Sequence, residues 1–101
     1  MRVAFAPDLL DRSRFGNVAD LVHVTNPFAI DDLTLGPGDV VAVDLSREGA
    51  LDAGMRAAAR GATVYGFASH VDTDTIRAAR DGGVIALARS AFFVKLDELF
   101  A

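Results

Sequence analysis

Five short apolar runs alternate along this chain with stretches that have helical character. The clearest run, Val40-Val41-Ala42-Val43, lies between two aspartates and is apolar at every position. A run of this kind, rather than one apolar at every second position, is typical of a strand covered on both faces of a sheet. Parallel strands need crossover connections, which the intervening stretches can supply as helices. The alternation therefore predicts an α/β fold built on one parallel sheet.

The boundaries of the elements follow from turn residues and from the apolar pattern. Strands are predicted over residues 2–6, 21–25, 39–44, 62–67 and 84–88. Helices are predicted over residues 9–19, in one or two turns within 27–33, and in the stretches after the third, fourth and fifth strands. Five strands in 101 residues favour a flavodoxin-like doubly wound sheet in the order 2-1-3-4-5, with short first and second helices. Because no linker or repeat interrupts the pattern, residues 1–101 are expected to form a single domain.

Polar residues indicate where the predicted helices begin. Asp8 precedes the first helix, Ser46 the third and Ser90 the last, and each side chain can accept hydrogen bonds from free backbone amides. Two helices also carry apolar residues at a spacing that gives one inward face. These residues are Leu51, Met55, Ala58 and Ala59 in the third helix and Phe92, Leu96, Leu99 and Phe100 in the last.

The composition excludes several classes of protein. The chain has no cysteine, so it forms no disulfide and offers no thiolate for catalysis or metal binding. Its net charge is −4 with acids and bases interspersed, which leaves no basic face for nucleic acid. No segment approaches the roughly 18 apolar residues of a membrane span, and the apolar N-terminal stretch is too short for a signal peptide. We therefore expect a soluble, cytoplasmic protein that binds neither nucleic acid nor membrane.

Ligands of doubly wound sheets gather at the carboxyl ends of the strands, near the point where the strand order reverses. In this chain, polar residues follow the first, third, fourth and fifth strands at that edge. The residues expected there are Asp8, Asp44, Ser69, His70, Arg89 and Ser90. We expect them to form a strand-end pocket.

Two parts of the chain resemble the receiver domains of response regulators. Residues 40–45, which contain an apolar strand that ends in Asp44, are similar to that family's third strand, whose terminal aspartate accepts a phosphoryl group. Residues 64–72, together with residues 76–83, are similar to the family's fourth strand and helix. The resemblance covers residues 39–100 and extends to the first third of the chain only in layout. It implies a CheY-like fold and a role in two-component signalling, with Asp44 at the phosphoacceptor position.

Three parts of the receiver site differ from the family's pattern. The family holds Mg²⁺ with a pair of acids after the first strand, whereas this chain has the single acid Asp8. The family's lysine followed by proline is replaced by Arg89-Ser90, and arginine is a planar fork rather than a compact ammonium. The family's hydroxyl after the fourth strand is replaced by Ala68, with Ser69 one residue later. The comparison implies a degenerate pseudo-receiver without a cofactor, in which Mg²⁺ would bind only if the receiver site were active.

The same residues have simpler interpretations. Asp44 can end its strand and help Ser46 to cap a helix, and Arg89 can pair with Asp44 in an empty pocket. His70 is expected in a loop and His23 in the core, and two histidines so far apart predict no metal site. Because the chain has no Gly-rich phosphate loop, nucleophile elbow or suggestive His–acid pair, the sequence does not predict an enzyme.

The leading hypothesis is a stand-alone pseudo-receiver that binds a signalling protein or a second copy of itself, without ordinary phosphotransfer. One alternative is a functional response regulator that is phosphorylated on Asp44. Further alternatives are an anti-sigma-antagonist-like (STAS) module, suggested by residues 43–46, and a small-molecule sensor. The helix predicted after the first strand argues against the STAS module, because that fold starts with a strand pair.

A candidate interface lies on the last predicted helix. Phe92 and Phe93 are neighbours about 100° apart around the helix axis, so one of them is expected to be exposed. Receiver domains commonly pair through the fourth helix, fifth strand and fifth helix, and the resemblance implies this face here. Phe92, Phe93 and Leu96 would then form the apolar centre of a homodimer interface with a charged rim. The alternative is that the extra aromatic rings pack on the short first and second helices.

Overall fold

The computed structural model describes all 101 residues and contains one sheet of five parallel strands in the order β2-β1-β3-β4-β5. The strands are β1 (Arg2–Phe5), β2 (Leu21–His23), β3 (Val40–Asp44), β4 (Thr63–Ala68) and β5 (Ile85–Ala88). The helices are α1 (Leu9–Arg14), α2 (Phe28–Asp31), α3 (Ala50–Ala59), α4 (Thr73–Asp81), α5 (Arg89–Val94) and α6 (Leu96–Leu99). The predicted flavodoxin-like order, with β3 at its centre and with short first and second helices, is confirmed.

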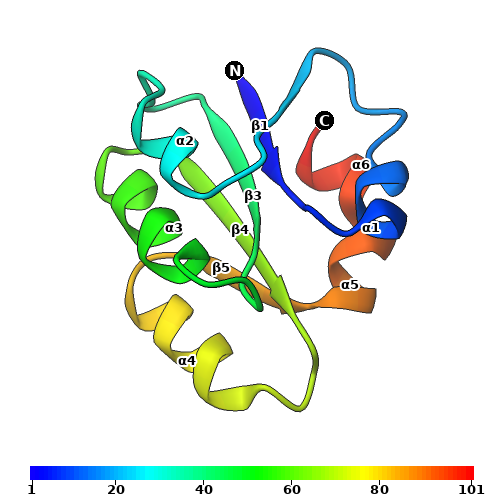
Figure 1. Ribbon diagram of the computed structural model, residues 1–101, viewed down its shortest axis with the longest axis vertical. Coiled ribbons are helices and arrows are strands. Elements are labelled where there is room, and N and C mark those ends of the chain that lie inside the picture. The colour runs from blue at the N-terminus through cyan, green and yellow to red at the C-terminus, as the bar shows by residue number, and fades with distance from the viewer.

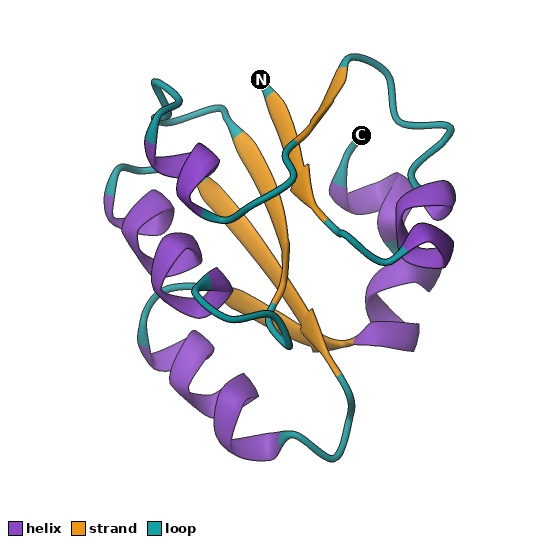
Figure 2. Ribbon diagram, in the orientation of Figure 1, coloured by secondary structure: helices purple, strands orange, loops and turns teal.

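Helices cover both faces of this sheet, as Figures 1 and 2 show. One face is covered by α2, α3 and α4, and the other by α1, α5 and α6. Alternate residues of the strands point to the two layers and give them different compositions. Val41 and Val43 belong to the core beneath α2, α3 and α4, whereas Ala42 and Phe67 belong to the aromatic core beneath α1, α5 and α6. No helix is long and apolar enough to span a membrane.

The inward face of α3 differs from the predicted one. The buried residues of this helix are Ala50, Ala53, Gly54 and Ala57. A Cβ placed on Gly54 would lie 3.3 Å from the Val43 side chain, so the helix backbone sits very close to the sheet. The larger Leu51 and Met55 are only partly buried and pack at the edge of the core. The face was mispredicted because small residues, not large ones, allow close packing on a β-branched strand surface.

The start of α1 is as predicted, although the helix is shorter. The Asp8 carboxylate Oδ1 accepts hydrogen bonds from the Leu10 amide at 2.9 Å and the Asp11 amide at 3.2 Å. These bonds satisfy two of the free amides at the helix start. The helix ends at Arg14 rather than at residue 19, and the chain then turns through Gly16.

Two predicted serine caps are absent. Gly49, with a φ of 81°, precedes α3, and the Ser46 hydroxyl instead donates to the Asp44 carboxylate. This φ lies in the left-handed region, which favours glycine at the position. Ala88 is the residue before α5, because that helix follows β5 without a loop, so Ser90 lies inside the first turn. The last helix is also interrupted, with α5 ending at Val94 and α6 following.

Candidate functional site

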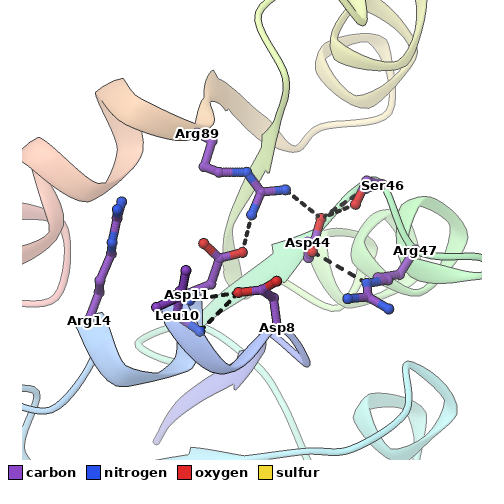
Figure 3. Close-up of a pocket in the computed structure, with 8 residues that line it drawn as sticks. All are labelled: Asp8, Leu10, Asp11, Arg14, Asp44, Ser46, Arg47 and Arg89. Atoms are coloured by element: carbon purple, nitrogen blue, oxygen red, sulfur yellow. Dashed lines mark hydrogen bonds and ion pairs between the residues drawn. The ribbon is translucent and has the colours of Figure 1, made fainter.

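The carboxyl ends of β1, β3 and β5 border an open hollow of about 640 Å³, which Figure 3 shows in close-up. Its lining residues are Asp8, Leu10, Asp11, Arg14, Asp44, Ser46, Arg47 and Arg89. Three are aspartates and three are arginines, so their formal charges balance. Only Leu10 is apolar, whereas pockets for small organic ligands are lined mostly by apolar side chains. The hollow is therefore a cluster of ion pairs rather than an apolar ligand pocket.

Asp44, the last residue of β3, is 1% exposed and has polar partners for both oxygens. Its Oδ1 accepts hydrogen bonds from the Ser46 amide at 3.0 Å and from the Ser46 hydroxyl at 2.6 Å. Arg89 Nη2 lies 3.5 Å from the same oxygen, and Arg47 Nε lies 3.7 Å from Oδ2. The carboxylate is thus held in place by its own loop and by two cations.

Arg89 joins Asp44 to a second buried acid. Its Nη1 donates to Asp11 Oδ2, and Asp11 is only 4% exposed. The guanidinium carbon lies 5.2 Å from the centre of the Phe67 ring, which adds a cation–π contact from β4. The two dashed contacts of Arg89 in Figure 3 connect α1 to the end of β3. One side chain at the start of α5 therefore ties three elements together.

Asp11 is the site residue that sequence reasoning missed. It lies one helical turn after the cap residue Asp8, which places it on the side of α1 that faces the strand ends. The spacing of three residues was a usable signal, because residues at i and i+3 share a helix face. Asp8 itself is bound to the first amides of α1. All three acids at the strand ends therefore have partners within the protein.

The predicted pocket is divided in the structure. Asp8, Asp44 and Arg89 meet in the hollow described above, whereas Ser69, His70 and Ser90 do not line it. Those three residues border a smaller neighbouring hollow of about 260 Å³, to which Arg89 also contributes. Ser69 and His70 are exposed in the loop after β4, beyond the end of the buried strand. Arg89 is the only residue of the predicted set that belongs to both hollows.

The two histidines lie apart from this network and from each other. His23 is half-buried at the end of the edge strand β2, with its ring edge-on to Phe15 at 6.2 Å between centroids. Burial, together with the nearby Arg12 charge, lowers the pKa of His23. The expectation of a core histidine is therefore only partly met. No group of three His, Asp or Glu side chains is arranged to hold a metal ion.

The three residues of the predicted interface lie mainly in the core. Phe92 is fully buried and Leu96 is 4% exposed, so neither is available on the surface. Phe93 is half-buried, with its ring 5.5 Å from Phe15 and 5.2 Å from Phe67. Phe15, which directly follows α1, accommodates the extra aromatic rings of α5. The exposed apolar side chain of α5 is Val94 instead.

Comparisons with known proteins identify no relative: no protein-family model, no curated protein and no solved structure matches the chain. The site must therefore be interpreted from its own geometry.

Proposed function

We propose that this protein is a stand-alone receiver-like regulatory module that acts through protein–protein contacts, without ordinary phosphotransfer on Asp44. The observation that carries the proposal is the pairing of Asp44. A carboxylate that attacks a phosphodonor needs an accessible oxygen that is free to form the new bond. Asp44 is 1% exposed, its Oδ1 already has the Ser46 and Arg89 contacts, and its Oδ2 lies beside Arg47.

The arrangement of the acids also argues against a Mg²⁺ site at the strand ends. Mg²⁺ is usually held by one or two carboxylates together with water and phosphate oxygens. Here Asp8 is bound to the backbone of α1, while Asp11 and Asp44 share the guanidinium of Arg89. A second cation at this place would have to displace Arg89 or lie beside it. The guanidinium of Arg89 therefore occupies the position between Asp11 and Asp44 at which an added cation would be attracted most strongly.

The fold and the surface favour a role in binding over the other functions considered. The all-parallel order, with α1 between β1 and β2, differs from the opening strand pair of a STAS module. The charged lining of the strand-end hollow offers little apolar surface to a small organic ligand. By contrast, Val94 is 86% exposed next to the half-buried Phe93, so the end of α5 presents apolar surface to the outside. Exposed apolar side chains that gather on one face are typical of protein-binding surfaces.

Treatment with acetyl phosphate and Mg²⁺, followed by measurement of the intact mass, tests the proposal. We expect no stable gain of a phosphoryl group by the wild type or by Asp44→Asn. A gain in the wild type that is absent from Asp44→Asn would overturn the proposal and favour a functional response regulator. A gain that persists in Asp44→Asn would arise at another residue, and Asp44 would remain outside the chemistry.

A further inference from the structure

A second hollow, of about 490 Å³, is lined by residues of α1, of the turn after it, and of α5 and α6. We call it the α1/α5 groove. It is bordered by Arg14 and Asn17 on one side and by Ser90, Phe93, Val94, Leu96 and Asp97 along the other. It shares with the strand-end hollow only Arg14, which lines both.

The groove has an apolar floor that no part of the chain covers. Val94 is 86% exposed and Phe93 is half-buried, so both present apolar surface to the outside. Leu96, which is 4% exposed, completes the apolar lining. On the other wall, the Arg14 guanidinium extends from α1 to the Phe93 ring. The apolar surface of the groove therefore lies on α5 and the start of α6.

The charges of the groove are of opposite sign on its two walls. The Arg14 guanidinium lies 5.0 Å from the centre of the Phe93 ring but forms no salt bridge. Asp97, on the wall formed by α6, also has no cationic partner. In an interface of two-fold symmetry, every contact between two different residues occurs twice. Residue i of one protomer contacts residue j of its partner, and residue j of the first protomer contacts residue i of the partner. A groove with one unpaired cation and one unpaired anion on opposite walls meets this requirement.

We propose that the α1/α5 groove binds a second copy of this chain as a two-fold dimer. Arg14 of each protomer then pairs with the partner's Asp97, and Phe93 and Val94 are buried at the centre. The inference rests on the proposed function and names the protein partner of that module. It also places the interface on α1, α5 and α6, where Leu96 lines the groove, whereas Phe92 is fully buried in the core.

Sedimentation equilibrium over a range of concentrations up to ~1 mM tests the dimer. We expect Arg14→Glu and Asp97→Arg each to raise the dimer dissociation constant by roughly tenfold or more, because like charges then face each other. The doubly reversed Arg14→Glu/Asp97→Arg variant should recover most of the wild-type affinity. Val94→Asp should abolish dimerisation, whereas Val71→Asp should leave it unchanged, since Val71 is equally apolar and 72% exposed but lies in the loop before α4.

Circular dichroism of each variant establishes that the fold is retained. A wild type that stays monomeric at every concentration would overturn the dimer proposal. A doubly reversed variant that fails to recover the affinity lost in the two single variants would also overturn it. Equal weakening by Val71→Asp would also contradict it. None of these results bears on phosphorylation of Asp44, so failure of the dimer and failure of the proposed function are distinguished by separate measurements.

Discussion

Replacement of Arg89 by methionine removes the cation that holds two buried carboxylates. Asp11 then has no remaining side-chain partner, whereas Asp44 keeps Ser46 and Arg47. Removing one partner of a fully buried ion pair costs about 3–5 kcal/mol. Because the Arg89 side chain is 34% exposed, water can reach the carboxylate after the substitution. We therefore expect Arg89→Met to lower the free energy of unfolding by about 2–3 kcal/mol.

Equilibrium unfolding in urea measures this loss, and thermal unfolding should show a fall in Tm of roughly 10–20 °C for a domain of this size. A double-mutant cycle with Asp11→Asn isolates the interaction itself. Because the double variant has no unpaired Asp11 charge, we expect a coupling free energy of at least about 1 kcal/mol. Arg77→Met is the matched control, since Arg77 is exposed and forms no salt bridge, and its effect should stay within about 0.5 kcal/mol.

An Arg89→Met variant as stable as the control variant would refute a stabilising role for this ion pair. That role would also be refuted if the costs of Arg89→Met and Asp11→Asn simply added, because the two residues would then act independently.

Three further substitutions test other parts of the structure. Asp8→Ala should lower the free energy of unfolding in urea by about 1 kcal/mol through loss of the α1 cap, whereas Asp8→Ser, which keeps an acceptor, should retain most of the stability; equal stability of Asp8→Ala and the wild type would contradict the cap. The pKa of His23 in the folded protein lies below its unfolded value, so the unfolded state binds more protons and stability is lost as the pH falls below 6.5. His23→Gln should reduce this loss of stability. An unchanged pH dependence of urea unfolding in this variant would contradict the prediction. Gly66→Ala would bring a Cβ within 2.7 Å of the Leu45 side chain and should cost about 1–3 kcal/mol in thermal unfolding, whereas an unchanged Tm would mean that Leu45 moves aside freely.

The fold could be predicted because each of its elements has a local signal. Residues 40–43 form an uninterrupted apolar run, and they became the central strand β3. Glycines at 61 and 82 follow the ends of α3 and α4, where the apolar pattern stops. Once five strands alternate with helices, the right-handed crossover rule leaves few possible strand orders. Most of the topology therefore follows from the sequence.

The side-chain partners could not be predicted in the same way. Ser46 was expected to cap α3, but its hydroxyl donates to Asp44, and Gly49, with a φ in the left-handed region, precedes the helix instead. The Arg89–Asp44 pair was expected, whereas its third member, Asp11, comes from a helix 78 positions earlier in the chain than Arg89. The spacing from Asp8 places Asp11 on the side of α1 that faces the strand ends, but its contact with Arg89 depends on how far α1 lies from the sheet edge, which no local pattern encodes.

The network at the strand ends and the α1/α5 groove are connected through α1. This helix has only six residues, too few to be stable by itself, and its Leu9 and Leu10 side chains are exposed rather than buried. It is held by the Asp8 cap, by the Asp11–Arg89 ion pair and by Phe15 in the aromatic core. The residues of the strand-end hollow therefore fix the position of one wall of the groove. A change at Arg89 would reach the proposed dimer surface through this helix, even though Arg89 does not line the groove.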